Sequence, residues 1–209
     1  IPQHFGAASV DRKAANTAAL RERMLLRDGR RPILAYVGRL DTQKGLHLIR
    51  HALFYALEQD AQFVLLGSGS EHGINEDFWH LKLRLNDNPD CHLEIGYDED
   101  LAHLIYAGAD LLVMPSLYEP CGLTQMIALR YGTVPLVRST GGLADTITDA
   151  DADPEAGNGF TFLPAEPAAF IDAATRTITA WNDAPRWAAI QRRGMLADAS
   201  WAAPAAHYE

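Results

Sequence analysis

The sequence has only two cysteines, no long apolar run and a deficit of positive charge. Cys91 and Cys121 form no Cys-x-x-Cys spacing, which favours a reducing compartment. No apolar run reaches the ~18 residues expected of a membrane-spanning helix, so no membrane partner is predicted. The net charge of −9 argues against a nucleic-acid partner, because binding to a phosphate backbone needs clustered Lys and Arg. It leaves a nucleotide ligand open, because a nucleotide needs only one or two local cations.

An initiator methionine and a signal peptide are also missing from the start of the chain. No basic stretch precedes an apolar one at Ile1, so we expect a processed or excised piece of a longer protein. The 209 residues suffice for one large α/β domain, and an apolar share of 48% is enough to build a buried core.

Short apolar runs typical of buried strands alternate with amphipathic helical stretches along most of the chain. The first 31 residues are polar, with one helix predicted from Asp11 to about Arg27. The predicted strands are 32–37, 62–66, 92–95, 111–114, 134–137 and 159–162. The predicted helices contain 49–57, 76–85, 99–107, 123–131, a short stretch from 142, 167–181, 185–196 and 201–207.

This alternation predicts an α/β fold, a single doubly wound Rossmann-like domain with a parallel sheet covered on both faces. The domain would span 32–209, with 1–31 as a lead-in that carries a helix. In such sheets the ligand lies beyond the carboxyl ends of the strands. The loops that follow the strands should therefore hold the site.

The loop after the first strand carries two cations, Arg39 and Lys44, around a turn that opens a helix. Free N–H groups and the partial positive charge of a helix N-terminus favour an anion there, such as a diphosphate. Arg can bind phosphate oxygens bidentately, whereas Lys supplies a mobile point charge. The alternative is a pair of solvated cations.

The loop after the fourth strand contains a carboxylate, a glycine and a threonine where the strand gives way to a helix. Glu119 could accept hydrogen bonds from sugar hydroxyls, and Gly122 permits a close backbone approach. Leu123 and Thr124 would present first-turn N–H groups to an anion. The alternative is a Ser or Glu cap on an ordinary helix.

The loop after the fifth strand ends in the pair Gly141 and Gly142 at a helix start, a generic anion-binding device. One such loop is weak evidence. Three of them at one edge of one sheet point more strongly to a binding site.

In order and spacing, the runs 38–46, 118–125 and 139–146 resemble the C-terminal domain of glycogen and starch synthases. The runs 157–160 and 200–208 resemble it too, so the resemblance covers essentially the whole chain. It implies the C-terminal half of a GT-B glycosyltransferase, in which two Rossmann-like domains face a cleft. The implied reaction moves glucose from ADP-glucose to the non-reducing end of an α-1,4-glucan, with retention of configuration.

The same resemblance implies a role for each site residue. Arg39 and Lys44 would bind the donor diphosphate and stabilise the leaving ADP, and Glu119 would contact the transferring glucose. Tyr97 would stack on the adenine. No cofactor and no metal are implied. The other implied substrate-binding residues are Gly38, Cys121, Gly122, Leu123, Thr124, Thr140, Gly141 and Gly142.

Two departures from the family pattern limit these expectations. Ile127 stands where many related retaining transferases have a second Glu, which fits the bacterial and plant synthases. The N-terminal domain, which supplies the acceptor site and a catalytic His, has no counterpart in these residues. We therefore expect weak nucleotide binding and no measurable transfer from this piece alone. Its expected location is the bacterial cytoplasm or the plastid stroma.

Two other functions stay open: a sibling transferase that uses UDP-glucose, and a non-catalytic module that senses nucleotide or glucan.

Four further patterns have simpler explanations than a second site. We expect His47 and His51 to lie on a solvated helix face, and 149–153 to form an exposed acidic turn. The glycines of 67–73 miss the dinucleotide spacing. The tail tryptophans should serve packing; they are Trp181, Trp187 and Trp201.

Overall fold

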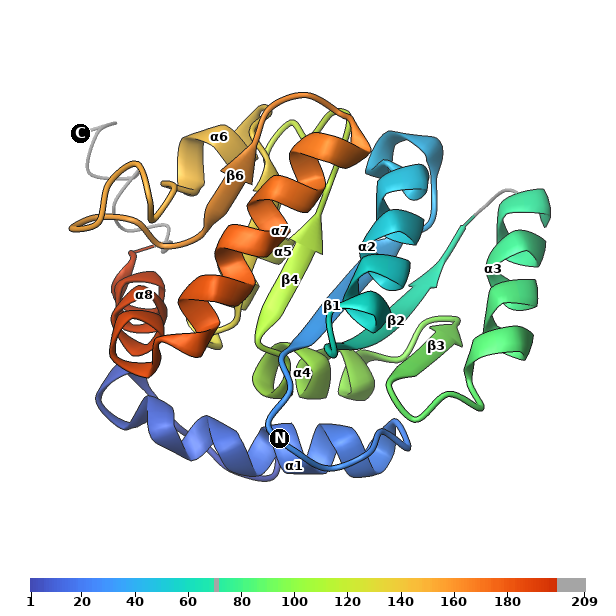
Figure 1. Cartoon of the computed structure of the whole chain (residues 1–209), viewed down its shortest axis with the longest axis horizontal. Helices are drawn as coiled ribbons and strands as arrows, with labels where there is room; N and C mark the ends of the chain where they lie inside the picture. Colours follow the sequence, from blue (N-terminus) through green and yellow to red (C-terminus); the bar gives the residue numbers. More distant parts are fainter. Residues whose placement is uncertain (70–71, 199–209) are drawn as a thin grey trace, which may run out of the picture.

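A computed structural model describes residues 1–69 and 72–198 and contains a six-stranded parallel sheet (Figure 1). The strand order is β3-β2-β1-β4-β5-β6, and every pairing is parallel, as predicted. All six predicted strands are present. Their bounds are β1 Ile33–Arg39, β2 Gln62–Ser68, β3 Cys91–Ile95, β4 Leu111–Met114, β5 Val134–Arg138 and β6 Phe160–Phe162.

The helices also follow the predicted order, with shifted ends. They are η1 Ala7–Arg12, α1 Lys13–Arg23, η2 Thr42–Lys44, α2 Leu46–Glu58, α3 His72–Leu85, α4 Glu99–Gly108, α5 Thr124–Arg130, α6 Gly142–Thr146, α7 Pro167–Asn182 and α8 Ala184–Leu196. The helix predicted for 201–207 lies outside the described residues. Among the described helices, none has the length and apolar character needed to cross a membrane.

The prediction of one helix from Asp11 to Arg27 was wrong at both ends. The segment begins as a 3-10 helix at Ala7, and the α-helix ends at Arg23. Leu25 has a left-handed backbone with φ 53°, and the N–H of Leu26 turns back to donate to the carbonyl of Arg21 at 2.9 Å. A left-handed residue followed by such a bond closes a helix end.

Two hydrophobic layers cover the sheet, and successive residues of β1 alternate between them. Leu34 and Tyr36 face the layer built with α2, α3, α7 and α8, whereas Ile33 and Ala35 face the layer built with α1, α4, α5 and α6. In Figure 1, α2 and α7 cross in front of the sheet. Both layers are buried, which explains why the strands are continuous apolar runs.

The opening segment packs against the domain. Leu20 is fully buried and Met24 nearly so, both in the layer that contains α4. Lys13 is 4% exposed, and its ammonium nitrogen lies 2.8–3.2 Å from four oxygens that share its three hydrogens. These belong to Tyr106, Ala107, Tyr131 and Thr133, at the C-terminal ends of α4 and α5.

Candidate functional site

The strand order reverses direction between β1 and β4, which places the loops after these two strands side by side. Such a switch point is where open α/β sheets bind ligands. The N–H of Leu117 donates to the carbonyl of Gln43 at 2.8 Å, and the Gln43 side-chain amide donates to the carbonyl of Tyr118 at 2.8 Å. Gly45 has φ 70°, and a Cβ there would lie 2.3 Å from the Pro115 carbonyl oxygen. The two loops therefore fit together only with glycine at position 45.

Lys44 and Glu119, one from each of these loops, form a shielded ion pair. Lys44 Nζ lies 2.6 Å from Glu119 Oε2, and the two side chains are 17% and 9% exposed. Ser116 Oγ donates to the same oxygen at 3.0 Å, and Ser116 is itself buried. The structure thus joins two predicted site residues and adds a third that the sequence analysis missed.

Arg39 has a different environment from Lys44. Its guanidinium lies 2.8 Å from Asp41 Oδ2, and its side chain is 70% exposed. The pair lacks hydrogen-bond geometry, because both Asp41 oxygens are buried without a hydrogen-bond partner. The guanidinium is exposed enough to reach an incoming anion, but turning away from Asp41 would leave a carboxylate that is only 18% exposed without its counter-ion.

The third predicted loop packs directly on the second. The N–H of Gly142 donates to the carbonyl of Glu119 at 2.9 Å. A Cβ at Gly141 would lie 2.1 Å from that carbonyl oxygen, and one at Gly142 would lie 1.8 Å from the Cys121 oxygen. The glycine pair thus allows a close backbone contact that supports Glu119. Thr140 is half-buried beside it.

Two cavities of about 210 Å³ each open at this edge of the sheet. They share Val37, Gly38 and Arg39 as a common wall. The cavity that contains Lys44 is the more polar of the two and is called the polar cavity, whereas the other is mainly apolar and is called the apolar cavity. The polar cavity is further lined by Tyr36, Met114, Ser116 and Thr124, and the apolar one by Leu66, Gly67, Ser68, Gly96, Tyr97, Asp98 and Ala102.

Five predicted site residues line these cavities, and a sixth supports them. Tyr97 is 87% exposed at the apolar cavity, ready to cover a planar group. Gly38, Arg39, Lys44 and Thr124 also contribute lining, whereas Glu119 lies behind Lys44. The remaining predictions fall outside both linings: Cys121, Gly122, Leu123, Thr140, Gly141 and Gly142.

Tyr36 is a lining residue that the apolar pattern of its strand concealed. It is 4% exposed, and its hydroxyl donates to the Arg39 carbonyl at 2.5 Å. Burial raises the pKa of Tyr36, and the nearby carboxylates of Asp41 and Glu119 raise it further. Tyr36 therefore serves as a neutral donor that fixes the backbone of the cation-bearing loop.

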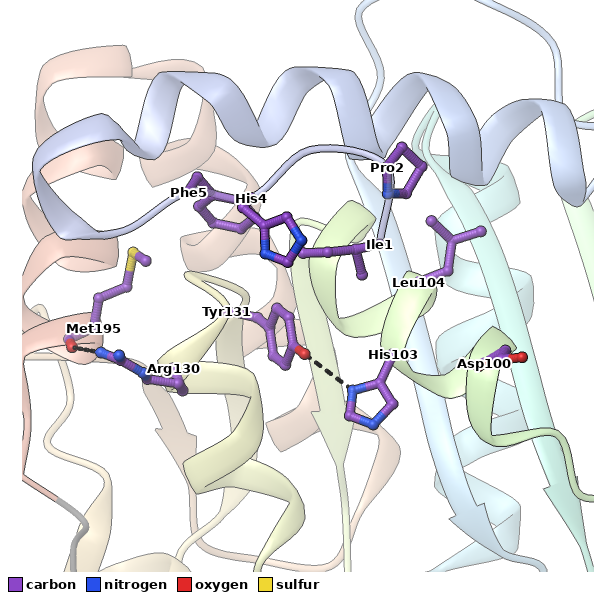
Figure 2. Close-up of a pocket in the computed structure, with 10 residues that line it drawn as sticks. All are labelled: Ile1, Pro2, His4, Phe5, Asp100, His103, Leu104, Arg130, Tyr131 and Met195. Carbon is purple, nitrogen blue, oxygen red and sulfur yellow. Dashed lines mark hydrogen bonds between the residues drawn. The ribbon is translucent and has the colours of Figure 1, made fainter.

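A larger cavity, of about 560 Å³, lies away from the strand ends (Figure 2). It is bordered by the opening segment, α4, the end of α5 and α8, and no predicted site residue lines it. His103 Nδ1 and the Tyr131 hydroxyl lie 3.0 Å apart within it. The cavity of larger volume is therefore not the one that the predicted site residues line.

The acidic turn and two of the tail tryptophans have structural roles. Among residues 1–69 and 72–198, no three His, Cys, Asp or Glu side chains cluster as metal ligands. Asp149 is only 13% exposed and pairs with Arg176, so the acidic turn is an ion-paired element instead of a free one. Trp187 is buried in the core, as predicted. The guanidinium carbon of Arg30 lies 4.6 Å from the centroid of the Trp181 ring. Trp201 lies outside the described residues.

Comparisons with known proteins give matches that cover most or all of the chain. A family model described as "Glycosyl transferases group 1" matches residues 21–193. Glycogen synthase 1 of Synechococcus sp. is 53% identical over 213 residues, which is all of this chain and 43% of that protein. Glycogen synthase 1 of Nitrosococcus oceani is 52% identical over all of this chain and 44% of that protein.

A solved structure is also similar to this chain over the full length of the chain. The catalytic domain of starch synthase IV from Arabidopsis thaliana, bound to ADP and acarbose, gives a TM-score of 0.96 at 40% identity. The overlap is 100% of this chain and 43% of that one. The chain thus spans less than half the length of each of these three relatives, and the resemblance seen in the loop motifs is confirmed.

Proposed function

Because the chain belongs to the group 1 glycosyl transferases, we propose that it is the donor-binding, C-terminal domain of a retaining glucosyltransferase. The proposed reaction transfers glucose from ADP-glucose to the non-reducing end of an α-1,4-glucan. The names of the relatives, glycogen synthases and a starch synthase solved with ADP, support this choice of donor and acceptor. The rest of the active site, including the acceptor site, would come from the remaining length of a protein like these relatives.

The observation that carries the proposal is the pair of adjacent cavities at the carboxyl ends of the strands. The apolar cavity suits a nucleobase, with Tyr97 as the stacking ring. The polar cavity brings Lys44 and Arg39 beside the first turn of α5, where a diphosphate would bind. Arg39 lies in the wall between them, where base and phosphates of one ligand would meet.

These residues would act mainly on the leaving group. As the bond to glucose breaks, negative charge develops on the β-phosphate, and fixed cations that meet this charge lower the barrier. Arg39 and Lys44 supply the positive charge, so we propose transfer without a metal or cofactor. Glu119 would accept hydrogen bonds from the glucose hydroxyls.

We also propose a reducing compartment, either the bacterial cytoplasm or the plastid stroma. Both cysteines are free thiols in the structure, and Cys121 is exposed beside the site. The relatives come from bacteria and from a plant.

Calorimetric titration with ADP and with UDP tests the donor site. Arg39→Ala and Lys44→Ala should each weaken ADP binding by about 1–3 kcal/mol, because each removes a charged hydrogen-bond donor. The exposed Arg39 should fall at the lower end of this range. Lys82→Ala is the matched control, because Lys82 is shielded and paired with Glu94 at 2.9 Å but lies outside both cavities.

Three outcomes would change the proposal. Tighter binding of UDP would move the chain to a UDP-glucose-dependent sibling. Unchanged ADP affinity in both cavity variants would remove the assigned site. If neither nucleotide binds, the titration is repeated on a longer protein that carries the remaining length of the relatives. Failure there rejects the donor-binding function.

A further inference from the structure

One oxygen of the Glu119 carboxylate, Oε2, accepts from two side-chain donors. Lys44 Nζ lies 2.6 Å from Oε2 and Ser116 Oγ lies 3.0 Å from it. Among residues 1–69 and 72–198, these are the side chains that donate to this carboxylate. Because the Glu119 side chain is only 9% exposed, water replaces little of what these two donors provide.

Besides Glu119, a phosphate ligand would also attract the Lys44 ammonium. Lys44 lines the polar cavity together with Arg39 and Thr124, where a diphosphate would present additional negative oxygens. An ammonium group has three donor hydrogens, so it can be shared or drawn towards the stronger anion. Movement towards phosphate removes the counter-ion from a buried carboxylate, which is strongly unfavourable unless another donor remains.

Arg39 faces a similar demand, because its partner Asp41 is 18% exposed and both Asp41 oxygens are buried without a hydrogen-bond partner. The two pairs differ in what remains when the cation moves towards a phosphate. Asp41 would keep no hydrogen-bond donor among the described residues, whereas Glu119 would keep the Ser116 hydroxyl. Lys44 is therefore the cation that can move, and Ser116 is the group that permits it.

We propose that Ser116 is a positioning residue for nucleotide binding: its hydroxyl holds the Glu119 carboxylate while the diphosphate draws Lys44 away. Ser116 is fixed for this task by its own backbone. It is 2% exposed, and Arg138 donates to its carbonyl at 3.3 Å and to that of Leu117 at 2.9 Å. The inference rests on the proposed function, because it needs a diphosphate in the polar cavity.

Titration of ADP into four proteins tests it: the parent chain, Ser116→Ala, Glu119→Gln and the double variant. Glu119→Gln should bind ADP about fivefold tighter, because an uncharged amide no longer competes for Lys44. Ser116→Ala should bind ADP about fivefold more weakly, because Lys44 must stay with Glu119. The double variant should match Glu119→Gln, since Ser116 has nothing left to hold.

Ser116→Cys separates hydrogen bonding from packing. A thiol is close in size to the hydroxyl but is a poor donor, so this variant should show the same loss as Ser116→Ala. Parent-like affinity in Ser116→Cys would assign the effect to volume and overturn the inference. Parent-like affinity in Ser116→Ala would also overturn it.

A loss on removing Ser116 that persists in the Glu119→Gln background would mean that Ser116 contacts the ligand directly, which also overturns the inference. If the parent chain binds ADP but the variants show any of these contrary patterns, the inference about Ser116 is wrong and the proposed function is unaffected. Absence of ADP binding in every protein, the parent included, fails the proposed function and the inference together.

Discussion

The buried Lys13 should make the stability of this protein rise with pH above neutrality. Burial lowers the pKa of Lys13 from 10.5 to about 7, and the charge of Asp110 opposes this only in part. In the unfolded chain the same side chain holds its proton up to a pH of about 10.4. Between these values the unfolded state binds more protons than the folded state.

The sign and size of the effect follow from linkage. Where the unfolded state binds more protons, the free energy of unfolding rises with pH. One group contributes at most about 1.4 kcal/mol per pH unit, which is about 4 kcal/mol between pH 7 and pH 10. The penalty of burying a charged Lys13 is complete below pH 7 and is relieved as the pH rises.

Chemical denaturation of the parent and of Lys13→Met, at pH 7, 8, 9 and 10, measures this contribution. Methionine is an apolar side chain without a titrating group, and the loss of four acceptor contacts is independent of pH. The unfolding free energy of the parent minus that of Lys13→Met should therefore climb across the series. A flat difference would refute the reasoning: the four oxygens around Nζ would then keep the ammonium charged throughout.

Two further predictions concern the glycine pair beside Glu119 and the acidic turn. Gly142→Ala should destabilise the protein by about 1–3 kcal/mol in thermal unfolding, because its Cβ would lie 1.8 Å from the Cys121 oxygen. Gly73→Ala, with open space around it, is the control, and equal stability of the two variants would contradict the contact. Burial raises the pKa of Asp151, but hydrogen bonds from its two arginine partners outweigh burial and lower it. Its stabilisation is present above pH ~4 and lost in acid, so Asp151→Asn should cost less than about 1 kcal/mol at pH 7 and almost nothing near pH 2; an equal loss at both values would contradict this.

The strands and their order along the chain were predictable because a strand buried on both faces is one continuous apolar run. The run 111–114 is the clearest case, and all four of its residues are buried. The convergence of the three loops followed from the same topology, since parallel strands end at one edge. The sequence therefore sufficed for the fold and for the prediction that these loops lie together.

The contacts inside the site were not predictable, because they depend on loop conformation. Lys44 meets Glu119 only because Gly45 brings its loop against Pro115. Ser116 had no predicted role in the site, yet its hydroxyl donates to the Glu119 carboxylate. Leu25 carries no sequence signal for the left-handed backbone that ends α1. Tertiary packing decides each of these features.

The packing of the opening helix affects how this domain could be exchanged between enzymes. The change in hydrophobic pattern at Pro32 suggests that a fusion could begin there. Such a cut would remove Lys13, Leu20 and Met24, and would leave the apolar surface of α4 and the carbonyls at its C-terminal end open to water. Exposed apolar surface of this kind promotes aggregation. A chimeric transferase that borrows this domain should therefore carry residues 7–31 along with it.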